Sequence, residues 1–281
     1  MATTTTPPVD DDAQATTLSR PAAERIGRLE RQAIVGVLMR EIINYGSYWK
    51  SSAFSSIMEP VIYLLAFGFG LGALVSDVGG YSYLEFVATG TVGMTVMYSG
   101  AFPSMFGTFV KYKFQRTYDA ILAAPVDTEE LVTAESVWMA TRVGVYGCAP
   151  VIVAMFFGLD PSWGMLLLPF ICFLSGIGWS LFGISVSATF NSMDNFSYVM
   201  TGFLTPMMLI AGTFFPIDNL PEWAQVLAHV NPLYNCVELV RGAVFGWHGL
   251  VEDLTHVAVL VAWALLLWRF AIRQMTKRLV D

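Results

Sequence analysis

The sequence predicts an all-α polytopic membrane protein with six transmembrane helices. Hydrophobic residues make up 55% of the chain and charged residues only 13%, against roughly 25% charged residues in soluble domains. The 24 glycines and 13 prolines are scattered among long apolar stretches rather than clustered in linkers. This composition excludes an ordinary soluble enzyme, because so many apolar side chains must face lipid or one another.

The first 50 residues are predicted to lie outside the membrane. Residues 1–21 are rich in Thr, Pro and Asp and contain no apolar run, which predicts a disordered cytoplasmic tail rather than a cleaved signal peptide. Residues 22–50 alternate apolar positions at helical spacing with arginines. That pattern is typical of an amphipathic helix on a membrane surface, and a cytosolic helix packed on its own chain is the alternative. Residues 51–281 form the predicted six-span membrane domain.

Each apolar stretch after residue 50 is about 20 residues or longer, enough to cross a hydrocarbon core of about 30 Å at about 1.5 Å per residue. The predicted spans are approximately 53–75, 84–110, 136–158, 164–190, 196–215 and 254–273. The boundaries carry an uncertainty of about two to four residues.

Basic residues predict the orientation of the spans. Thirteen of the 15 Lys and Arg residues lie in one of three places. They precede the first span, lie between the second and third spans, or lie at and after the inner end of the sixth span. Arg142 sits near the inner end of the third span, and Arg241 lies between the fifth and sixth. Because basic residues are retained in the cytoplasm, both termini are predicted to be cytoplasmic. Counting 22–50 as a seventh span would bury four arginines at about 2.5 to 3.5 kcal/mol each.

The chain lacks the common signatures of membrane enzymes. No HExxH zinc motif is present, and the three histidines, His229, His248 and His256, have no spacing that gathers them on one helix face. The run Gly183–Ser187 lacks the second glycine of a nucleophile elbow. Cys148, Cys172 and Cys236 are interpreted as small apolar residues. We therefore expect no catalytic residue and no metal site.

The chain cannot hydrolyse ATP by itself, because no lysine follows the glycine spacing of a Walker A motif, so any energy for active transport would come from elsewhere. A partner ATPase or an ion gradient could supply it. Glu59, which precedes Pro60, is the candidate ion-relay carboxylate. It either points into a cavity or snorkels to the inner interface.

Two segments between spans carry the functional inference. Residues 114–125 place Phe114, Tyr118, Ile121, Leu122 and Pro125 at helix-face spacing, which predicts a short amphipathic cytoplasmic helix that ends at the proline. It offers an apolar ridge to a cytosolic partner, or else rests on lipid. Asp127 or Thr128 is expected to cap the next helix.

The segment between the fifth and sixth spans is broken by prolines into apolar pieces too short to cross a membrane. It predicts short helices that dip into the outer leaflet and return, with Trp223 and Trp247 at the interface. Glu238 and Arg241, three residues apart, are interpreted as a pair on a helix surface.

These two segments resemble the membrane subunits of type-2 ATP-binding-cassette exporters, and the resemblance covers nearly the whole chain. Its strongest parts are Asp119-Ala-Ile-Leu-Ala-Ala-Pro-Val126 and the outer series Phe215-Pro216, Leu220-Pro-Glu-Trp223, Asn231-Pro-Leu233 and Arg241. The form Thr117-Tyr-Asp-Ala-Ile121 is similar to the branch of nodulation lipooligosaccharide export permeases, whereas many drug-export members carry Gly-Thr-Leu there.

The resemblance implies a non-enzymatic permease in the bacterial cytoplasmic membrane. It implies two copies of a separate ATPase that holds ATP and Mg²⁺, a second permease chain in a dimer expected to be a homodimer, contact with membrane lipids, and no nucleic acid. The chain itself would bind no cofactor. The expected cargo is an amphipathic glycolipid or lipooligosaccharide-like molecule moved outward. A hydrophobic drug or natural product is the first alternative, and an ion-coupled secondary carrier is the second. A membrane scaffold protein without transport activity is a further functional alternative.

The resemblance assigns residues to two sites, and a third site is a prediction from residue type and helical spacing. The coupling helix that would sit in a groove of the ATPase contains Phe114, Arg116, Tyr118, Asp119, Ile121, Leu122 and Pro125. The outer gate, formed by a re-entrant hairpin, contains Phe215, Pro216, Pro221, Trp223, Asn231, Pro232 and Arg241. The substrate path, for which ordinary helix packing is the alternative interpretation, contains Glu59, Tyr63, Phe67, Met200 and Met207, with Met208 in the same group.

Overall fold

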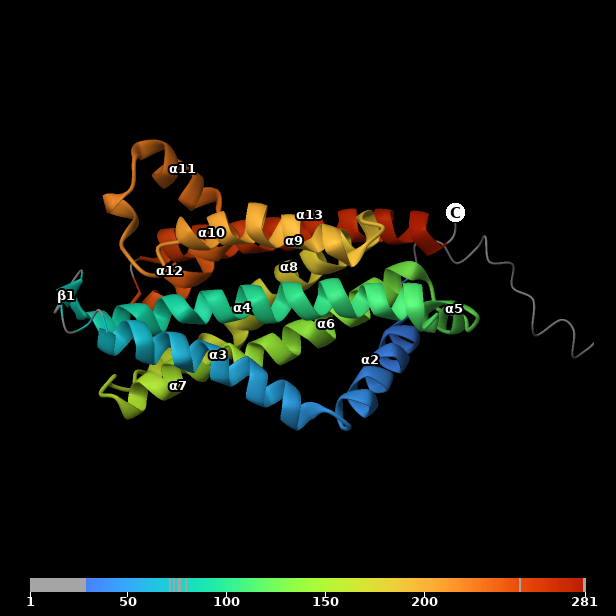
Figure 1. Cartoon of the computed structure of the whole chain (residues 1–281), viewed down its shortest axis with the longest axis horizontal. Helices are drawn as coiled ribbons and strands as arrows, with labels where there is room; N and C mark the ends of the chain where they lie inside the picture. Colours follow the sequence, from blue (N-terminus) through green and yellow to red (C-terminus); the bar gives the residue numbers. More distant parts are fainter. Residues whose placement is uncertain are drawn as a thin grey trace, which may run out of the picture.

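The computed structural model is an elongated helical bundle (Figure 1). It describes residues 29–70, 72, 74, 77–78, 80–247 and 249–279, so the predicted tail 1–21 and the first part of 22–50 lie outside the described residues. The principal helices are α2 (Arg31–Tyr45), α3 (Trp49–Gly70), α4 (Tyr83–Phe109), α5 (Thr117–Leu122), α6 (Thr128–Tyr146), α7 (Ala149–Phe156), α8 (Leu168–Thr189), α9 (Phe196–Val199), α10 (Thr205–Leu209), α11 (Glu222–Val230), α12 (Pro232–Phe245) and α13 (Leu250–Leu279).

Short elements complete the chain. Two π-helical segments, η2 (Val110–Phe114) and η5 (Met200–Leu204), extend α4 and join α9 to α10. The 3₁₀ segments are η3 (Trp163–Leu167), η4 (Met193–Asn195) and η6 (Ile217–Asn219). A small antiparallel hairpin of β1 (Asp77–Val78) and β2 (Tyr81–Ser82) caps the start of α4, with Val78 opposite Tyr81. It is a minor departure from the all-α prediction.

The long helices follow the predicted apolar stretches. Among the residues that the structure describes, three helical stretches are long and apolar enough to cross a membrane by length and composition: Thr128–Phe156, Trp163–Thr189 and Leu250–Leu279. They coincide with the third, fourth and sixth predicted spans. The helices α3 and α4 occupy the first and second predicted spans. The all-α membrane architecture is therefore confirmed, whereas the number of crossings stays a prediction.

The fifth predicted span is shorter than expected. Its helical run begins at Phe196, passes through the π-helical η5 and ends at Leu209, not at Phe215. The chain then turns at Gly212, whose φ of +70° lies in the left-handed region that glycine tolerates best. The hydropathy of the sequence predicts a longer span, because Ala211, Phe214 and Phe215 are apolar although they belong to the turn.

Small residues let α4 and α8 pack closely at the centre of the bundle. A Cβ atom at Gly183 would lie 2.5 Å from the carbonyl oxygen of Ala101 and 2.8 Å from the Cβ of Ser104. Trp179 is completely buried beside this contact. Membrane helices commonly gain packing energy by close approach through small residues. Burying apolar side chains gives little driving force there, because lipid is as apolar as the protein interior.

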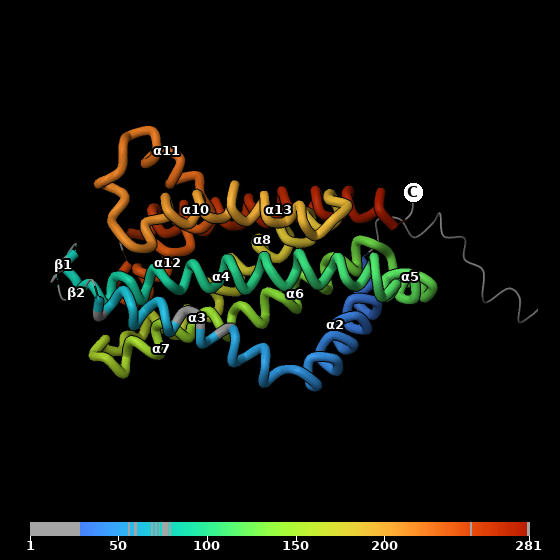
Figure 2. The backbone as a smooth tube through the Cα atoms, viewed as in Figure 1, coloured from blue at the N-terminus to red at the C-terminus, as the bar shows by residue number. Residues whose placement is uncertain are grey.

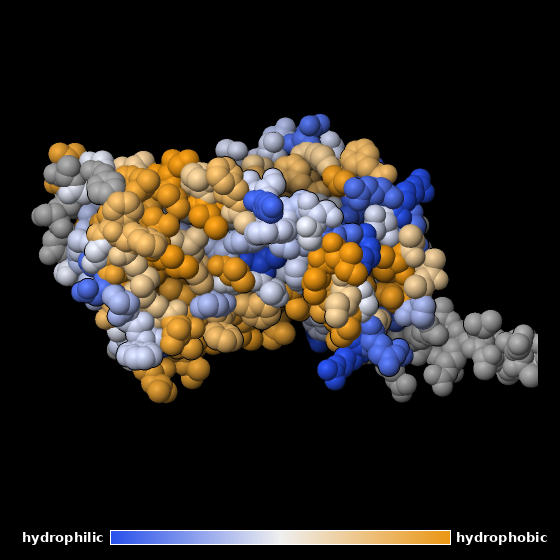
Figure 3. All heavy atoms as spheres, turned by 90° about the horizontal axis from the view of Figure 1, so that it is seen from below, coloured by the Kyte–Doolittle hydropathy of each residue, from blue (hydrophilic) through white to orange (hydrophobic). Residues whose placement is uncertain are grey.

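The two ends of the bundle differ in character. The helix α5, the start of α6 and the end of α13 lie at one end, while β1, α7 and α11 lie at the other (Figures 1 and 2). Apolar surface covers much of the face in Figure 3, and hydrophilic surface gathers toward the end that holds α5. The described parts of the predicted cytoplasmic segments, α5 and the end of α13, therefore lie together at the more hydrophilic end.

Candidate transport cavity and coupling segment

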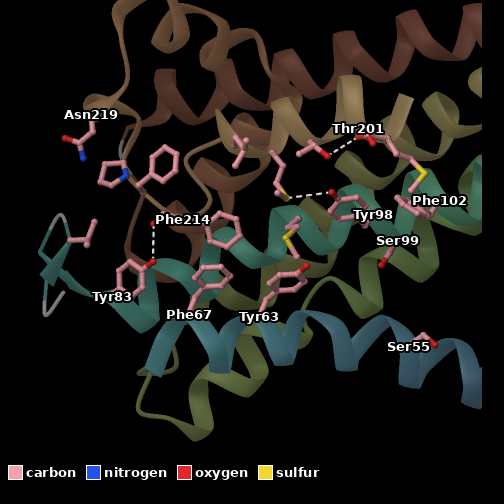
Figure 4. Close-up of a pocket in the computed structure, with 18 of the residues that line it drawn as sticks. Ser55, Tyr63, Phe67, Tyr83, Tyr98, Ser99, Phe102, Thr201, Phe214 and Asn219 are labelled. Carbon is pink, nitrogen blue, oxygen red and sulfur yellow. Dashed lines mark hydrogen bonds between the residues drawn. The ribbon is translucent and has the colours of Figure 1, made fainter. Parts of the chain in front are cut away.

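A cavity of about 1170 Å³ opens along the side of the bundle between α3, α4 and the η5–α10 run. Figure 4 shows Ser55 and Asn219 toward opposite ends of its lining. Each of its walls comes from a different part of the chain, which is why sequence spacing within one helix could not reveal it. The segment 214–216, which follows the fifth helical run, also lines the cavity.

Aromatic rings form the main surface of this cavity. Tyr63 and Phe67 of α3 stack at 6.2 Å between ring centroids, and Phe67 meets Phe214 of the outer segment at 4.8 Å. On α4, Tyr98 and Phe102 pack edge to face at 5.3 Å. Figure 4 shows Tyr63 and Phe67 projecting from α3, with Phe214 beyond Phe67. Such a lining binds apolar and ring-shaped groups well.

Hydroxyl groups interrupt the aromatic lining at intervals. Thr205 donates a hydrogen bond to the carbonyl of Met200 at 3.0 Å, and Tyr83 donates to the carbonyl of Phe214 at 3.4 Å. Ser99 and Thr201 also line the cavity. The lining contains no charged side chain among the residues whose side chains the structure describes. The cavity therefore suits an uncharged or amphipathic molecule, because charged cargo would be desolvated there without a counter-charge.

The predicted path residues are partly brought together. Tyr63, Phe67, Met200 and Met208 line the cavity. Met207 is not in the lining: it packs against the apolar core, and its carbonyl accepts a hydrogen bond from Asn231 at 2.8 Å. Glu59 lies in α3, but its side chain is outside the described residues.

The outer segment folds into two short helices, as predicted, and Arg241 of α12 ties it to the bundle. Its guanidinium donates to Glu238 at 2.8 Å and to the carbonyl of Gly212 at 2.7 Å, and it stacks 4.0 Å from the ring centroid of Phe86 on α4. The interpretation of Glu238 and Arg241 as a plain surface pair is wrong, since their side chains are only 17% and 11% exposed. Buried charge pairs with further hydrogen bonds fix geometry more strongly than surface pairs.

The other predicted gate residues fall into three groups. Asn231 and Pro232 are buried at the junction of α11 and α12, where the side chain of Asn231 accepts a hydrogen bond from the N–H of Leu233 at 2.9 Å and caps α12. Phe215 and Pro216 line the cavity mouth. Pro221 and Trp223 lie at the exposed start of α11, with Trp223 66% exposed.

The cytoplasmic segment differs from the prediction in its extent. The helix α5 spans only Thr117–Leu122 and does not reach Pro125. It is separated from η2 by Arg116, whose backbone is left-handed at φ 51° and ψ 29°. This turn puts Phe114 and Tyr118 on different faces: Phe114 is 68% exposed, whereas Tyr118 is completely buried. Of the predicted coupling residues, Ile121 and Leu122 are partly buried, and the exposed ones are Phe114, Arg116, Asp119 and Pro125.

A buried ionic network holds this segment to the bundle. The ammonium group of Lys111 lies 2.8 Å from Glu135 of α6 and 2.9 Å from Glu41 of α2. Tyr118 of α5 donates a short hydrogen bond to the other oxygen of Glu135, and Arg40 pairs with Glu41 at 2.8 Å. Four elements, α2, η2, α5 and α6, thus meet at one cluster.

The electrostatics of the network favour its charged form. Burial alone would lower the pKa of Lys111, but the neighbouring carboxylates of Glu135 and Glu41 outweigh it and raise the pKa above the ordinary 10.5. Burial and the adjacent Glu135 carboxylate raise the pKa of Tyr118 well above its ordinary value. Lys111 therefore stays protonated and the phenol stays neutral, so Tyr118 acts as the donor to Glu135.

Comparisons with known proteins agree with this architecture. The family model described as ABC-2 type transporter matches residues 32–245. The chain belongs to this family. Nodulation protein J of Sinorhizobium fredii (strain NBRC 101917 / NGR234) is 33% identical over 239 residues, which are 83% of this chain and 90% of the relative. Nodulation protein J of Rhizobium leguminosarum bv. trifolii is 34% identical over 75% of this chain and 82% of the relative. Inner membrane transport permease YadH of Escherichia coli (strain K12) is 27% identical over 82% of this chain and 89% of the relative.

Membership in the ABC-2 type transporter family confirms the recognition made from the coupling segment and the outer proline series. The matched region includes the cavity, the coupling segment and the outer helices. An ABC-2 permease is a transmembrane subunit that works with an ABC ATPase. The ionic network was missed by sequence reasoning, although Glu41, Lys111 and Glu135 are ionisable groups beside or within apolar stretches, which is a recognisable signal of paired burial.

Proposed function

We propose that this ABC-2 permease exports an amphipathic glycolipid or lipooligosaccharide-like molecule across the bacterial cytoplasmic membrane. The observation that carries the proposal is the cavity of about 1170 Å³, which is lined by aromatic rings and hydroxyls and has no charge on its described side chains. Aromatic faces suit acyl chains and the C–H faces of sugar rings, and hydroxyls suit sugar hydroxyls. The identity to proteins named nodulation protein J supports the same cargo class.

The power source in this proposal is a pair of separate ATPase subunits that hold ATP and Mg²⁺. Each would receive the exposed surface of one α5 segment in a dimer of two permease chains. Closure of the ATPases around ATP would move α5, and the network of Lys111, Glu41 and Glu135 would pass that displacement to α2, α4 and α6 together. The equilibrium between inward-open and outward-open states would shift because the ATPases bind ATP with different affinity in the two states.

The exposed flanks of the cavity support the dimer. Phe54 and Ile62 on α3 are 63% and 58% exposed, and Tyr198 in α9 is 76% exposed. We propose that a second copy of the chain covers these flanks and completes the cavity. The proposed orientation has α5 and the ends of α2 and α13 in the cytoplasm, since basic residues gather there. The proposed domain division is a tail at 1–21, a surface helix within 22–50 and a six-span domain at 51–281.

Reconstitution tests the proposal. The permease is placed in vesicles with and without its ATPase, and movement of a fluorescent acylated oligosaccharide is followed after ATP addition. We expect transport only with both the ATPase and ATP, and weaker transport of the free oligosaccharide or the free fatty acid. Transport driven by an ion gradient in the absence of the ATPase, and sensitive to Glu59→Gln, would replace the proposal with the ion-coupled carrier. Efficient transport of hydrophobic drugs but not of the acylated sugar would favour the drug-export alternative.

A further inference from the structure

The corner between α2 and α3 holds an arginine whose hydrogen-bonding capacity is not filled. The chain turns between Tyr45 and Trp49, and α3 leaves at a marked angle to α2 (Figure 2). Arg142 of α6 reaches into this corner, with its guanidinium carbon 4.7 Å from the ring centroid of Tyr45. One nitrogen donates to the hydroxyl of Ser52. No ion pair joins Arg142 to any carboxylate that the structure describes.

Several donors at this corner lack acceptors among the described groups. The Nε of Arg142 and the indole Nε1 of Trp138 are buried with no hydrogen-bond partner. The Nη1 of Arg142 has only the sulfur of Met139, at 3.5 Å, and a thioether is a weak acceptor. The hydroxyls of Tyr45 and Tyr146 share one hydrogen bond, so one of their two protons is still available for another acceptor.

These donors converge on one small region. Trp138 and Arg142 are four residues apart and therefore lie on the same face of α6. The ring of Tyr45 contacts both, at 5.4 Å between its centroid and that of Trp138 and at 4.7 Å from the Arg142 guanidinium. Leaving a buried donor unpaired costs about 1 to 3 kcal/mol, and more for a charged group. An arrangement of several such donors around one cation is suited to an anion with several oxygen atoms.

The nearby carboxylates are engaged elsewhere. Glu41, one helical turn before Tyr45, binds Lys111 and Arg40. Glu135, about two turns before Arg142, binds Lys111 and Tyr118. Neither is free to neutralise Arg142, and each already has its counter-charge.

The surroundings of the corner are those of a membrane interface. The outward face of α2 exposes apolar side chains, among them Ile43 at 73%, and the corner itself exposes Tyr48 at 46% and Trp49 at 49%. Thr141 and Val145 beside Arg142 are exposed, so the α6 side of the corner is open to lipid. Apolar surface with Tyr and Trp at its edge is typical of the headgroup level of a bilayer, where lipid phosphates lie.

We infer that the corner formed by Tyr45, Ser52, Trp138, Arg142 and Tyr146 binds the phosphate of an inner-leaflet phospholipid. The phosphate oxygens accept from the guanidinium in place of the Met139 sulfur, and from the spare tyrosine proton. The acyl chains lie along the exposed Thr141–Val145 side of α6. The inner-leaflet assignment depends on the orientation proposed above, whereas the phosphate site itself does not.

Native mass spectrometry of the full-length protein in detergent tests this inference without the ATPase. The probes are phosphatidylglycerol, a diacylglycerol with the same acyl chains, and inorganic phosphate. We expect saturable binding of phosphatidylglycerol, at least about tenfold weaker binding of the diacylglycerol, and no competition from inorganic phosphate at equal concentration. Arg142→Gln should weaken phosphatidylglycerol binding about tenfold or more.

Matched variants separate this site from general charge effects. Arg269→Gln removes an exposed arginine of α13 and should leave phosphatidylglycerol binding unchanged. Trp138→Phe keeps a ring against Tyr45 but removes the N–H, so it should weaken binding less than Arg142→Gln while preserving the fold. Equal binding by wild type and Arg142→Gln, or equal binding of the diacylglycerol, would overturn the inference. Competition by inorganic phosphate at equal affinity would assign a free anion instead of lipid. Dissociation of a permease dimer by Arg142→Gln without loss of lipid would assign Arg142 to the subunit interface.

Failure of this experiment leaves the proposed export function untouched, because transport is measured with ATPase and cargo. Failure of the export assay likewise leaves the lipid measurement valid.

Discussion

Lys111 and Glu135 join the end of one long helix to the start of the next, with Nζ 2.8 Å from Oε1. The chain between them contains α5, and Tyr118 of α5 donates to the second oxygen of the same carboxylate. The ion pair therefore joins the two ends of this loop, and the hydrogen bond of the Tyr118 phenol fixes α5 within it. The Glu135 carboxylate therefore gives α5 a direct side-chain connection to the end of α4 and to α6, in addition to the backbone.

Lys111→Met should destabilise the protein and impair coupling. It leaves Glu135 and Glu41 buried without their shared cation, which costs about 3 kcal/mol. The control is Lys113→Met, two residues away, where the lysine is exposed and has only a cation–π contact at 5.9 Å from Phe109. Thermal unfolding in detergent and ATPase activity of the assembled complex measure the two effects. Equal midpoints for the two variants would show that the network carries no stability.

The ion pairs of Lys111 should stabilise the folded protein up to alkaline pH. The folded-state pKa of Lys111 is raised above the ordinary 10.5, so its contribution to stability is complete below that value and is lost as pH rises through the folded pKa. Unfolding midpoints of the wild type and Lys111→Met, measured from pH 7 upward, should differ by a constant amount until about pH 10 and then converge. Convergence near neutral pH would mean that Lys111 is not charged in the folded state.

Leu122→Asp should abolish ATPase coupling and export without loss of the folded permease. Leu122 is only partly buried at the end of α5, so the new carboxylate reaches solvent in the free subunit but meets an apolar groove in the proposed complex. Leu122→Met keeps the apolar surface and serves as the control. Co-purification of the ATPase and ATP-driven transport are the measurements. Unchanged export by the aspartate variant would contradict the coupling role.

Arg241→Gln should loosen the outer segment. The substitution leaves Glu238 without its cation and removes the hydrogen bond to Gly212 and the stacking on Phe86, for a loss of about 2 to 4 kcal/mol. Arg273→Gln on the exposed side of α13 is the matched control. Amide hydrogen exchange should rise in the residues of α12 and the Gly212 turn and stay constant in α6. Unaltered exchange in α12 would refute the anchoring role of Arg241.

Gly183→Ala tests the close approach of α4 and α8. Its Cβ would lie 2.5 Å from the Ala101 carbonyl oxygen, so one helix must move, at a cost of about 1 to 3 kcal/mol. Gly107→Ala on α4 is the control, because no atom lies within 4 Å of its added Cβ. A lower unfolding midpoint is expected for the first variant alone. A wild-type midpoint for Gly183→Ala would show that the contact is looser than the structure has it.

Much of the fold could be predicted from apolar run length. The predicted span 84–110 matches α4 to within one residue at each end, whereas α13 extends beyond the predicted span 254–273 at both ends. Of the two predicted caps of α6, Asp127 and Thr128, the structure has Asp127, whose N–H donates to Glu130 at 2.9 Å. The fifth span was predicted too long, because hydropathy does not distinguish an apolar helix from an apolar turn and only the backbone at Gly212 shows where the helix ends.

The candidate sites were less accessible to sequence reasoning. Periodicity showed that residues 114–125 have an apolar face, but it could not show that the left-handed turn at Arg116 rotates Tyr118 inward and leaves Phe114 outside. The partners of Arg142 and Arg241 were equally hidden, because Ser52 and Gly212 lie 90 and 29 residues away in the chain.

The sequence by itself determined that this chain is a helical membrane protein of the ABC-2 type, because hydropathy and motif spacing are local properties of a chain. Tertiary structure alone decided which ionisable groups are paired, which aromatic rings share a cavity and which face of α5 is exposed. The physical reason is that burial and charge pairing depend on how helices far apart in the chain are rotated and packed against one another. Local sequence patterns do not specify that geometry.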